Sequence, residues 1–305
     1  MTPTTTRQTM PTPPHSSDSM RSLPTLQHSL RAFASSPRTF QILCSLPHPL
    51  PTLQTPLKTL YILDSSFNPP TCAHLHICTS ALLNDKPSAV PKRLLLLLAT
   101  QNADKAPKPA AFEQRLAMMS YFAEELVKEV SGSEEGMHDD GDVIVDVGVT
   151  KEARFIDKAR VLEEQEEYSH QGPVEQVHLT GYDTLIRLLD TKYYPPDHTL
   201  KPLEELFEKH RVRVTRRTDD AWGRRDEQDG YVRKIADGQT EAEGGKKEWA
   251  ERIELVEGRK EGEEIISSTK VREAAKGRDE QALKKLVADG VANWILQERL
   301  YLEED

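Results

Sequence analysis

Two short stretches of the sequence place hydroxyl, histidine and basic side chains where helices are expected to begin. The first, SSFNPPTCAHLHI (residues 65–77), directly follows an apolar run. Pro69 and Pro70 prevent a helix from beginning before about residue 71, which puts His74 in the first turn of the helix that follows. The N–H groups at a helix start lack partners and favour anions, so this stretch indicates an anion site, for which phosphate is one candidate.

Several hydrogen-bond donors surround this helix start. Ser66 and Phe67 can offer backbone N–H groups, Thr71 a hydroxyl and His74 a ring N–H. Together they would form a phosphate cradle without a glycine-rich loop. A proline-stiffened turn followed by a surface histidine explains the same residues equally well, so this stretch alone leaves both interpretations open.

The second stretch, IISSTKVREAAKG, occupies residues 265–277 near the C-terminus. Consecutive hydroxyl residues precede Lys270 and Arg272, and Ser268 or Thr269 is expected to cap a helix. The free N–H groups, the hydroxyls and the guanidinium could converge on a polyphosphate. Taken alone, the stretch is explained better by an ordinary capped helix with solvated basic residues.

The rest of the chain must supply the elements that position these stretches. Apolar runs predict strands at residues 59–63, 93–99, 143–149, 176–180, 211–215 and 252–256. Helical patterns lie between them at 72–83, 112–130, 153–166 and 182–189, with a helical tail at 269–302 broken at Gly277 and Gly290. This alternation indicates an α/β fold with a parallel sheet covered on both faces. Ligands of such sheets bind beyond the carboxyl ends of the strands, where residues 65–74 leave the first strand.

The two stretches together resemble the motifs of the nicotinamide mononucleotide adenylyltransferases, a family of the nucleotidylyltransferase superfamily. The family's first motif, G-S-F-N-P-x-T-x-x-H, is similar to residues 65–74, and its last, I-S-S-T-x-[IV]-R, is similar to residues 266–272. A G-x-D-x-L element matches Gly181, Asp183 and Leu185. Two further stretches resemble family elements, namely VTRR (214–217) and FEQRLAMM (112–119). LDSSFNPPT and QNADK are similar to the divergent fungal branch, and the whole resemblance covers about residues 59–301.

The resemblance implies a Rossmann-like doubly wound sheet with a helical C-terminal part, and an adenylyl transfer. ATP and nicotinamide mononucleotide would give NAD and pyrophosphate. The acceptor phosphate is already an anion and needs no general base, so the protein must hold two polyanions in line and neutralise the leaving charge. Mg²⁺ would be bound mainly through the ATP phosphates.

The resemblance also implies roles for particular residues. His74 and Arg272 would be the catalytic residues, stabilising the transferring group and the outer phosphates. ATP would be bound by Ser66, Phe67, Thr71, His74, Gly181, Asp183, Ser268, Thr269, Lys270, Val271 and Arg272. The acceptor would be bound by Ser65, Ser66, Lys105 and Arg216. Lys108 is a nearby substitute for Lys105.

The sequence departs from the family pattern at three places. Ser65 replaces the usual first glycine, which makes close backbone approach less free. Asp64 adds a carboxylate beside a polyanion site and is expected to face the sheet or a cation. No tryptophan follows the strand near Val149, where the family often stacks the nicotinamide; Phe155 is the nearest aromatic residue, and packing is its expected role. The catalytic class is therefore better supported than the pyridine substrate.

Composition limits the other classes of function. The 305-residue chain has a formal net charge of −10, which argues against non-specific binding to nucleic acid or to an anionic membrane. Its three cysteines form no CxxC pair and fit a reducing compartment. No apolar run is long enough for a membrane span, and cytoplasmic or also nuclear localisation is expected. The acid-poor start, residues 1–58, leaves a mitochondrial signal as the alternative.

The same patterns predict the domain organisation. Residues 1–22 read as a disordered Pro/Ser/Thr-rich tail, 23–58 as a helical extension with a helix near 26–34, and 59–305 as the nucleotidylyltransferase domain. Residues 218–247 read as a charged surface insertion that buries little. The insertion or the tail is a possible contact for a protein partner.

Two other functions stay open at this point. One is a transferase for a different phosphorylated acceptor, such as phosphopantetheine or nicotinic acid mononucleotide. The other is an ATP-binding or slowly ATP-hydrolysing protein of the same fold that serves as an interaction platform. Phosphate motifs argue against pure scaffolding, whereas the acceptor pocket decides between the two transferases.

Overall fold

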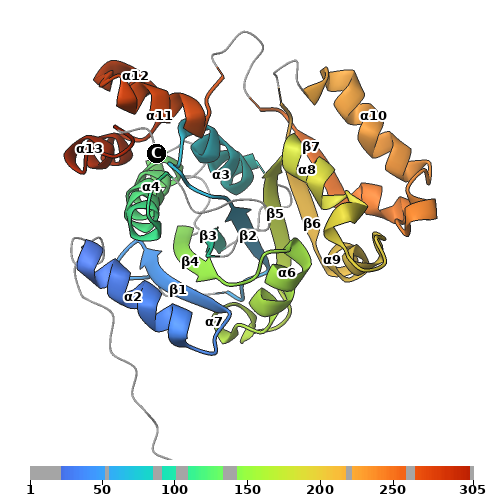
Figure 1. Cartoon of the computed structure of the whole chain (residues 1–305). Helices are drawn as coiled ribbons and strands as arrows, with labels where there is room; N and C mark the ends of the chain where they lie inside the picture. Colours follow the sequence, from blue (N-terminus) through green and yellow to red (C-terminus); the bar gives the residue numbers. More distant parts are fainter. Residues whose placement is uncertain are drawn as a thin grey trace, which may run out of the picture.

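The computed structural model describes residues 22–51, 55–84, 91–100, 109–132, 143–217, 222–258 and 265–302, which form a seven-stranded sheet with helices on both sides (Figure 1). The strand order is β1-β4-β3-β2-β5-β6-β7. The strands are β1 Phe40–Leu46, β2 Thr59–Asp64, β3 Lys92–Ala99, β4 Val143–Thr150, β5 Glu175–Gly181, β6 Arg211–Thr215 and β7 Ile253–Val256. Neighbouring strands are parallel except for β1, which pairs antiparallel with β4.

Helices cover both faces of the sheet. One face carries α2, α3, α4 and the C-terminal helices α11, α12 and α13, and the other carries α6 to α9 (Figure 1). The helices are α2 Leu23–Ser35, α3 Cys72–Asn84, α4 Phe112–Gly132, α6 Phe155–Glu163, α7 Glu166–Ser169, α8 Tyr182–Leu188, α9 Glu204–Lys209, α10 Arg225–Ala236, α11 Ser268–Lys276, α12 Glu280–Leu286 and α13 Asp289–Gln297. The predicted α/β doubly wound fold with a helical C-terminal part is confirmed. No helix within the described ranges is long and apolar enough to cross a membrane.

The central strands were predictable because both of their faces are covered. Leu94, Leu96 and Leu98 pack in the core under α3 and α4, whereas Leu95 and Leu97 pack on the opposite side. A strand buried on both faces has a continuous apolar sequence, which is the pattern in residues 93–99. All six predicted strands are present.

The chain connections run in opposite directions along the sheet after β2 and after β5, two neighbouring strands at its centre. From β2 the chain runs through α3 to β3 on one side, and from β5 it runs through α8 and α9 to β6 on the other. The two strands pair in parallel, with Leu63 opposite Leu179 near their carboxyl ends. Such a reversal leaves a crevice beyond the strand ends, where open α/β sheets bind ligands.

Two segments differ from the expectations. Residues 23–58 hold a strand as well as a helix, because β1 buries only Phe40 and Cys44 and its weak alternation was hidden among prolines. The C-terminal helices separate near Val287 and Ala288, so Gly290 lies inside the first turn of α13 and breaks nothing. A Cβ at Gly290 would lie 3.0 Å from the ring of Tyr121, so the glycine allows close packing on α4.

The charged segment 218–247 contains a helix in its described part. Its described part, from residue 222, contains α10, in which Gln228 and Ile235 are buried. Gln228 hydrogen-bonds the backbone N–H and carbonyl of Arg217. Apolar residues are sparse here, but they gather on one face, and that is enough to bury it. Most described residues of the segment are nevertheless exposed or half-buried, so its reading as a surface insertion and as a partner contact stays a prediction. Residues 1–21 lie outside the described residues.

A buried carboxylate stabilises the β1–β4–β3 side of the sheet. Asp146 is fully buried and accepts hydrogen bonds from Arg93, Ser45 and Tyr168, the Arg93 Nε contact being 2.8 Å. Burial of the phenol next to this carboxylate raises the pKa of Tyr168, so Tyr168 remains a donor.

We expect Asp146→Asn to lower the free energy of unfolding by about 3 kcal/mol, because it leaves the Arg93 guanidinium half-paired in a buried site. Urea denaturation followed by circular dichroism measures the change. Arg225→Gln, which breaks an exposed pair with Glu257, serves as the control and should change stability by less than about 1 kcal/mol. Equal effects of the two substitutions would contradict a stabilising role for the buried network.

Candidate active site

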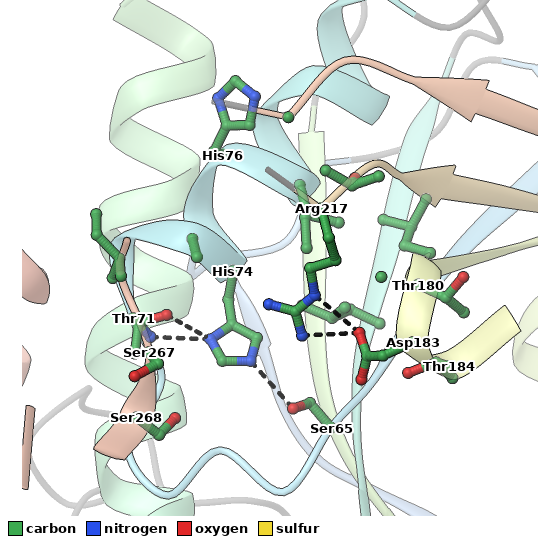
Figure 2. Close-up of a pocket in the computed structure, with 18 of the residues that line it drawn as sticks. Ser65, Thr71, His74, His76, Thr180, Asp183, Thr184, Arg217, Ser267 and Ser268 are labelled. Carbon is green, nitrogen blue, oxygen red and sulfur yellow. Dashed lines mark hydrogen bonds and ion pairs between the residues drawn. The ribbon is translucent and has the colours of Figure 1, made fainter. Parts of the chain in front are cut away.

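A cavity lies at the carboxyl ends of β2, β5 and β6, where the first and last sequence motifs meet (Figure 2). In Figure 2 His74, Thr71, Ser267 and Ser268 stand on one side of it, and Thr180, Asp183 and Thr184 on the other, with Arg217 between. The wall consists of Leu63, Asp64, Ser65, Thr71, Ala73, His74, His76, Ile77, Leu179, Thr180, Gly181, Asp183, Thr184, Thr215, Arg216, Arg217, Gly258, Ile266, Ser267 and Ser268. The folded chain therefore brings the two motifs together, as the resemblance required.

The His74 ring is fixed by contacts on both nitrogens. Its Nδ1 lies 3.0 Å from the backbone N–H of Thr71 and 2.9 Å from the Thr71 hydroxyl, while its Nε2 lies 3.1 Å from Ser65 Oγ. A backbone N–H can only donate, so Nδ1 must be the acceptor and the proton of the neutral ring stays on Nε2. His74 thus points an N–H donor at Ser65 and into the cavity (Figure 2).

The imidazole is neutral at physiological pH. Burial, aided by the charge of Arg217, lowers the pKa of His74 from 6.5 to about 4. The unfolded chain therefore takes up this proton first as the pH falls. The contribution of His74 to folding stability is complete above pH 6.5 and is lost as the pH decreases from 6.5 towards about 4.

The loop before α3 is strained and supports His74 from behind. Phe67 has a φ of +44°, a left-handed conformation that is costly for a residue with a large side chain. Its fully buried ring packs 5.6 Å from the His74 ring. Phe67 therefore positions His74 and does not line the cavity, while Ser66 is exposed beside it.

The N-terminus of α11 faces the cavity through a different cap from the one predicted. Ser267 is the N-cap and accepts from Lys270 N at 3.3 Å. Ser268 instead donates to the carbonyl of Pro69 at 2.9 Å. Thr269 and Lys270 do not line the cavity, and the Val271 side chain is buried in the core. In a run of hydroxyl residues the sequence could not tell which one caps the helix.

Arg272 holds the two motifs together and does not line the cavity. Its guanidinium donates to the carbonyl of Asn68 at 2.9 Å and to Thr269 Oγ1 at 3.0 Å. The Asn68 side chain accepts from Tyr301 at 2.8 Å. The predicted phosphate clamp is thus, in this structure, a link between α11 and the loop of the first motif.

Arg217 lines the cavity together with Arg216, the arginine that the sequence had suggested. Arg217 donates to Asp183 Oδ1 through Nε at 2.9 Å and Nη2 at 2.7 Å. A Cβ at Gly181 would lie 2.7 Å from the same Oδ1, so glycine leaves the room that Asp183 needs. Asp183 of the sequence motif therefore pairs with the Arg217 guanidinium, and Gly181 of the same motif leaves space for this pair.

Arg216 also lines the cavity, but its guanidinium is engaged by carboxylates. Its guanidinium pairs with Asp229 of α10 and with Glu257, and it also donates to the carbonyl of Leu255. With only 12% of its side chain exposed, Arg216 is a structural residue here. A signal in the sequence could have shown this, because Val212 and Val214 are buried on the face covered by α8 to α10 and Arg216 continues their alternation.

The remaining predicted residues have separate outcomes. Thr71 and Ser65 lie in the wall and hold His74, whereas Lys105 and Lys108 fall outside the described residues. Asp64 faces a cation as expected, because Lys158 of α6 pairs with it. The sequence interpretation missed Thr180, Thr184, His76, Ser267 and Arg217 in the wall. Within the described part of the chain no cluster of three or more His, Cys, Asp or Glu residues could hold a metal ion.

Comparisons with known proteins agree with this fold. A putative nicotinamide mononucleotide adenylyltransferase of Schizosaccharomyces pombe is 35% identical over 248 residues, covering 81% of this chain and 87% of that protein. The structure of Plasmodium falciparum nicotinic acid mononucleotide adenylyltransferase complexed with NaAD covers 80% of this chain and 97% of its own, with 14% identity and a TM-score of 0.50. The same enzyme complexed with APC gives 13% identity and a TM-score of 0.49. No protein-family model matches the chain.

Proposed function

Because the chain belongs to the nicotinamide mononucleotide adenylyltransferase family of nucleotidyltransferases, we propose that it transfers the adenylyl group of ATP to nicotinamide mononucleotide. The products are NAD and pyrophosphate, and the reaction belongs to NAD biosynthesis. An oxygen of the acceptor phosphate attacks the α-phosphorus of ATP. The bond between the α-phosphorus and the oxygen that bridges it to the β-phosphate breaks, and pyrophosphate leaves.

One observation carries this proposal: the cavity combines anion-binding groups from distant parts of the chain at the sheet's carboxyl edge. Three groups face this cavity: the Nε2–H of His74, the N-terminal end of α11 with Ser267 and Ser268, and the guanidinium of Arg217. Donors and cations of this kind stabilise phosphoryl charge without acting as a nucleophile. The set suits transfer between two polyanions that the protein holds in line.

The residues take distinct roles in this reaction. His74 donates its Nε2–H to the ATP phosphates as charge develops on them, and Ser65 and Thr71 keep the ring oriented. Ser267 and Ser268, with the first N–H groups of α11, bind the outer phosphates. Asp183 accepts from the adenosine ribose hydroxyls, and Arg217 balances its charge. Mg²⁺ would be held mainly by the ATP phosphates, where it would supply positive charge that stabilises the leaving pyrophosphate.

The relative from Schizosaccharomyces pombe supports nicotinamide mononucleotide as the acceptor over other phosphorylated acceptors. That protein carries the name of a nicotinamide mononucleotide adenylyltransferase and matches most of this chain. The likeness to the nicotinic acid mononucleotide enzyme, at 14% identity, concerns the fold and does not bear on the acceptor.

An acceptor-dependence assay tests the proposal. The purified full chain with ATP and Mg²⁺ should release pyrophosphate only when nicotinamide mononucleotide is present, in equal amount to the NAD formed. Phosphate release without an acceptor would identify an ATP-hydrolysing protein instead. Pyrophosphate release that requires phosphopantetheine would assign the chain to another acceptor class.

A further inference from the structure

Asp64 places a carboxylate in the wall of a cavity that otherwise suits polyanions. Its side chain is 13% exposed and lines the cavity directly after β2. Lys158, 5% exposed on α6, hydrogen-bonds Asp64 Oδ2 from behind and does not itself line the cavity. The negative end of this ion pair is therefore the end that faces a ligand. No described residue hydrogen-bonds the second oxygen, Oδ1.

Thr180 presents an unpartnered hydroxyl beside Asp64. The pairing of Leu63 with Leu179 places Asp64 and Thr180 next to one another on the same face of β2 and β5. Thr180 is only 5% exposed and lines the cavity, yet its Oγ1 has no hydrogen-bond partner among the described residues. A buried hydroxyl without a partner destabilises the protein, so a ligand or a water is expected to satisfy it.

The surroundings of this pair within the described residues are polar, and Lys158, the lysine in contact with Asp64, is already paired with it. Two residues before Thr180 on the same face of β5, His178 is buried and its Nε2 also lacks a partner in the described part of the chain. Burial lowers the pKa of His178 to about 3, so the ring is neutral. This side of the cavity thus differs from the side formed by His74 and the N-terminus of α11, and Arg217 lies between the two (Figure 2).

We propose that Asp64 and Thr180 recognise the pyridine end of the acceptor and select a carboxamide over a carboxylate, with Lys158 as the residue that positions Asp64. This inference rests on the proposed function. The carboxamide N–H₂ donates to Asp64 Oδ1, and its carbonyl accepts from the Thr180 hydroxyl. The cationic pyridinium ring lies favourably near the carboxylate, whereas a ring carboxylate meets like charge and has no N–H to offer.

Acceptor selectivity in single variants tests the inference. Values of kcat/KM are measured for nicotinamide mononucleotide and nicotinic acid mononucleotide with saturating ATP and Mg²⁺. The wild-type chain is expected to prefer the amide, and Asp64→Asn should reduce the amide-to-acid ratio by about tenfold or more, because the like charge is gone. Asp146→Asn is the matched control: it also breaks a buried carboxylate–cation pair, but away from the cavity, and should lower Tm without changing the ratio.

A second variant decides the question even where Asp64→Asn fails to fold. Thr180→Val removes a hydroxyl that bonds no described residue, so Tm should not fall. The KM for the acceptor should rise about fivefold to tenfold while the KM for ATP stays unchanged. An unchanged acceptor KM, or an unchanged ratio in folded Asp64→Asn, would overturn the inference and leave the proposed function intact. So would a wild-type preference for the acid, whereas absence of transfer to both acceptors would reject the proposed function and this inference with it.

Discussion

His74→Ala is expected to lower kcat by about a hundredfold to a thousandfold while the protein keeps its fold. The Nε2–H of His74 is held towards the cavity by contacts of Nδ1 with Thr71, so it is organised before the substrate arrives. A donor fixed in this way stabilises the transition state without reorganisation at the moment of reaction. Steady-state kinetics with ATP and nicotinamide mononucleotide measure the effect, and thermal unfolding checks the fold.

His74→Gln is the matched control for this prediction. The side-chain amide of glutamine can place an N–H₂ near the position of the imidazole Nε2, so part of the donor is restored. We expect His74→Gln to lose about tenfold in kcat and His74→Ala substantially more. Equal losses in the two variants would mean that the ring acts by packing against Phe67 and not by donating a hydrogen bond.

The pH dependence gives an independent check on the same residue. The pKa of His74 is lowered to about 4, so the free enzyme keeps the neutral donor throughout the range from pH 5 to 8. The logarithm of kcat/KM should therefore show no inflection from His74 in that range. An acidic limb near pH 6.5 that disappears in His74→Gln would contradict the lowered pKa of His74.

The strands could be predicted because a strand that is buried on both faces has apolar residues at nearly every position. Contacts between segments that are distant in the sequence leave no such pattern. Residues 93–99 are apolar throughout since both faces of β3 are covered. The strand β1 escaped prediction because it lies at the sheet edge, buries only Phe40 and Cys44, and stands among prolines. For α10, sparse apolar residues such as Ile235 proved sufficient for packing.

The sequence predicted the two motifs that form the candidate site. It did not predict which of their side chains point into the cavity and which bond to the protein. The helix starts at Cys72 and Ser268 follow from local prolines and hydroxyls. Arg272, by contrast, donates to the Asn68 carbonyl, and nothing in either stretch shows that this loop packs against α11. Cap choice within consecutive hydroxyls is similarly open, because neighbouring positions have nearly equal propensity.

Arg217→Ala should lower kcat/KM for ATP by about tenfold to a hundredfold, through a higher KM, because a charge-assisted bond to the nucleotide is lost. Arg217 is 39% exposed in its side chain and pairs with Asp183 across the cavity wall, so it is available to a ligand. Arg216→Ala should instead lower Tm, since it leaves Asp229 and the carbonyl of Leu255 without their donor. Titration of ATP in both variants, with Tm measured in parallel, separates the two arginines.

The alternation of β6 explains why the two neighbouring arginines should behave so differently. Val212 and Val214 point into the core under α8, and Arg216 continues that side towards Asp229 of α10. Arg217 follows on the opposite side, where the strand ends and the cavity begins. If Arg216→Ala raised the KM for ATP while Arg217→Ala did not, the guanidinium that meets the nucleotide would be the one suggested by the VTRR motif. The loop after β6 would then have to rearrange when ATP binds, freeing Arg216 from both carboxylates.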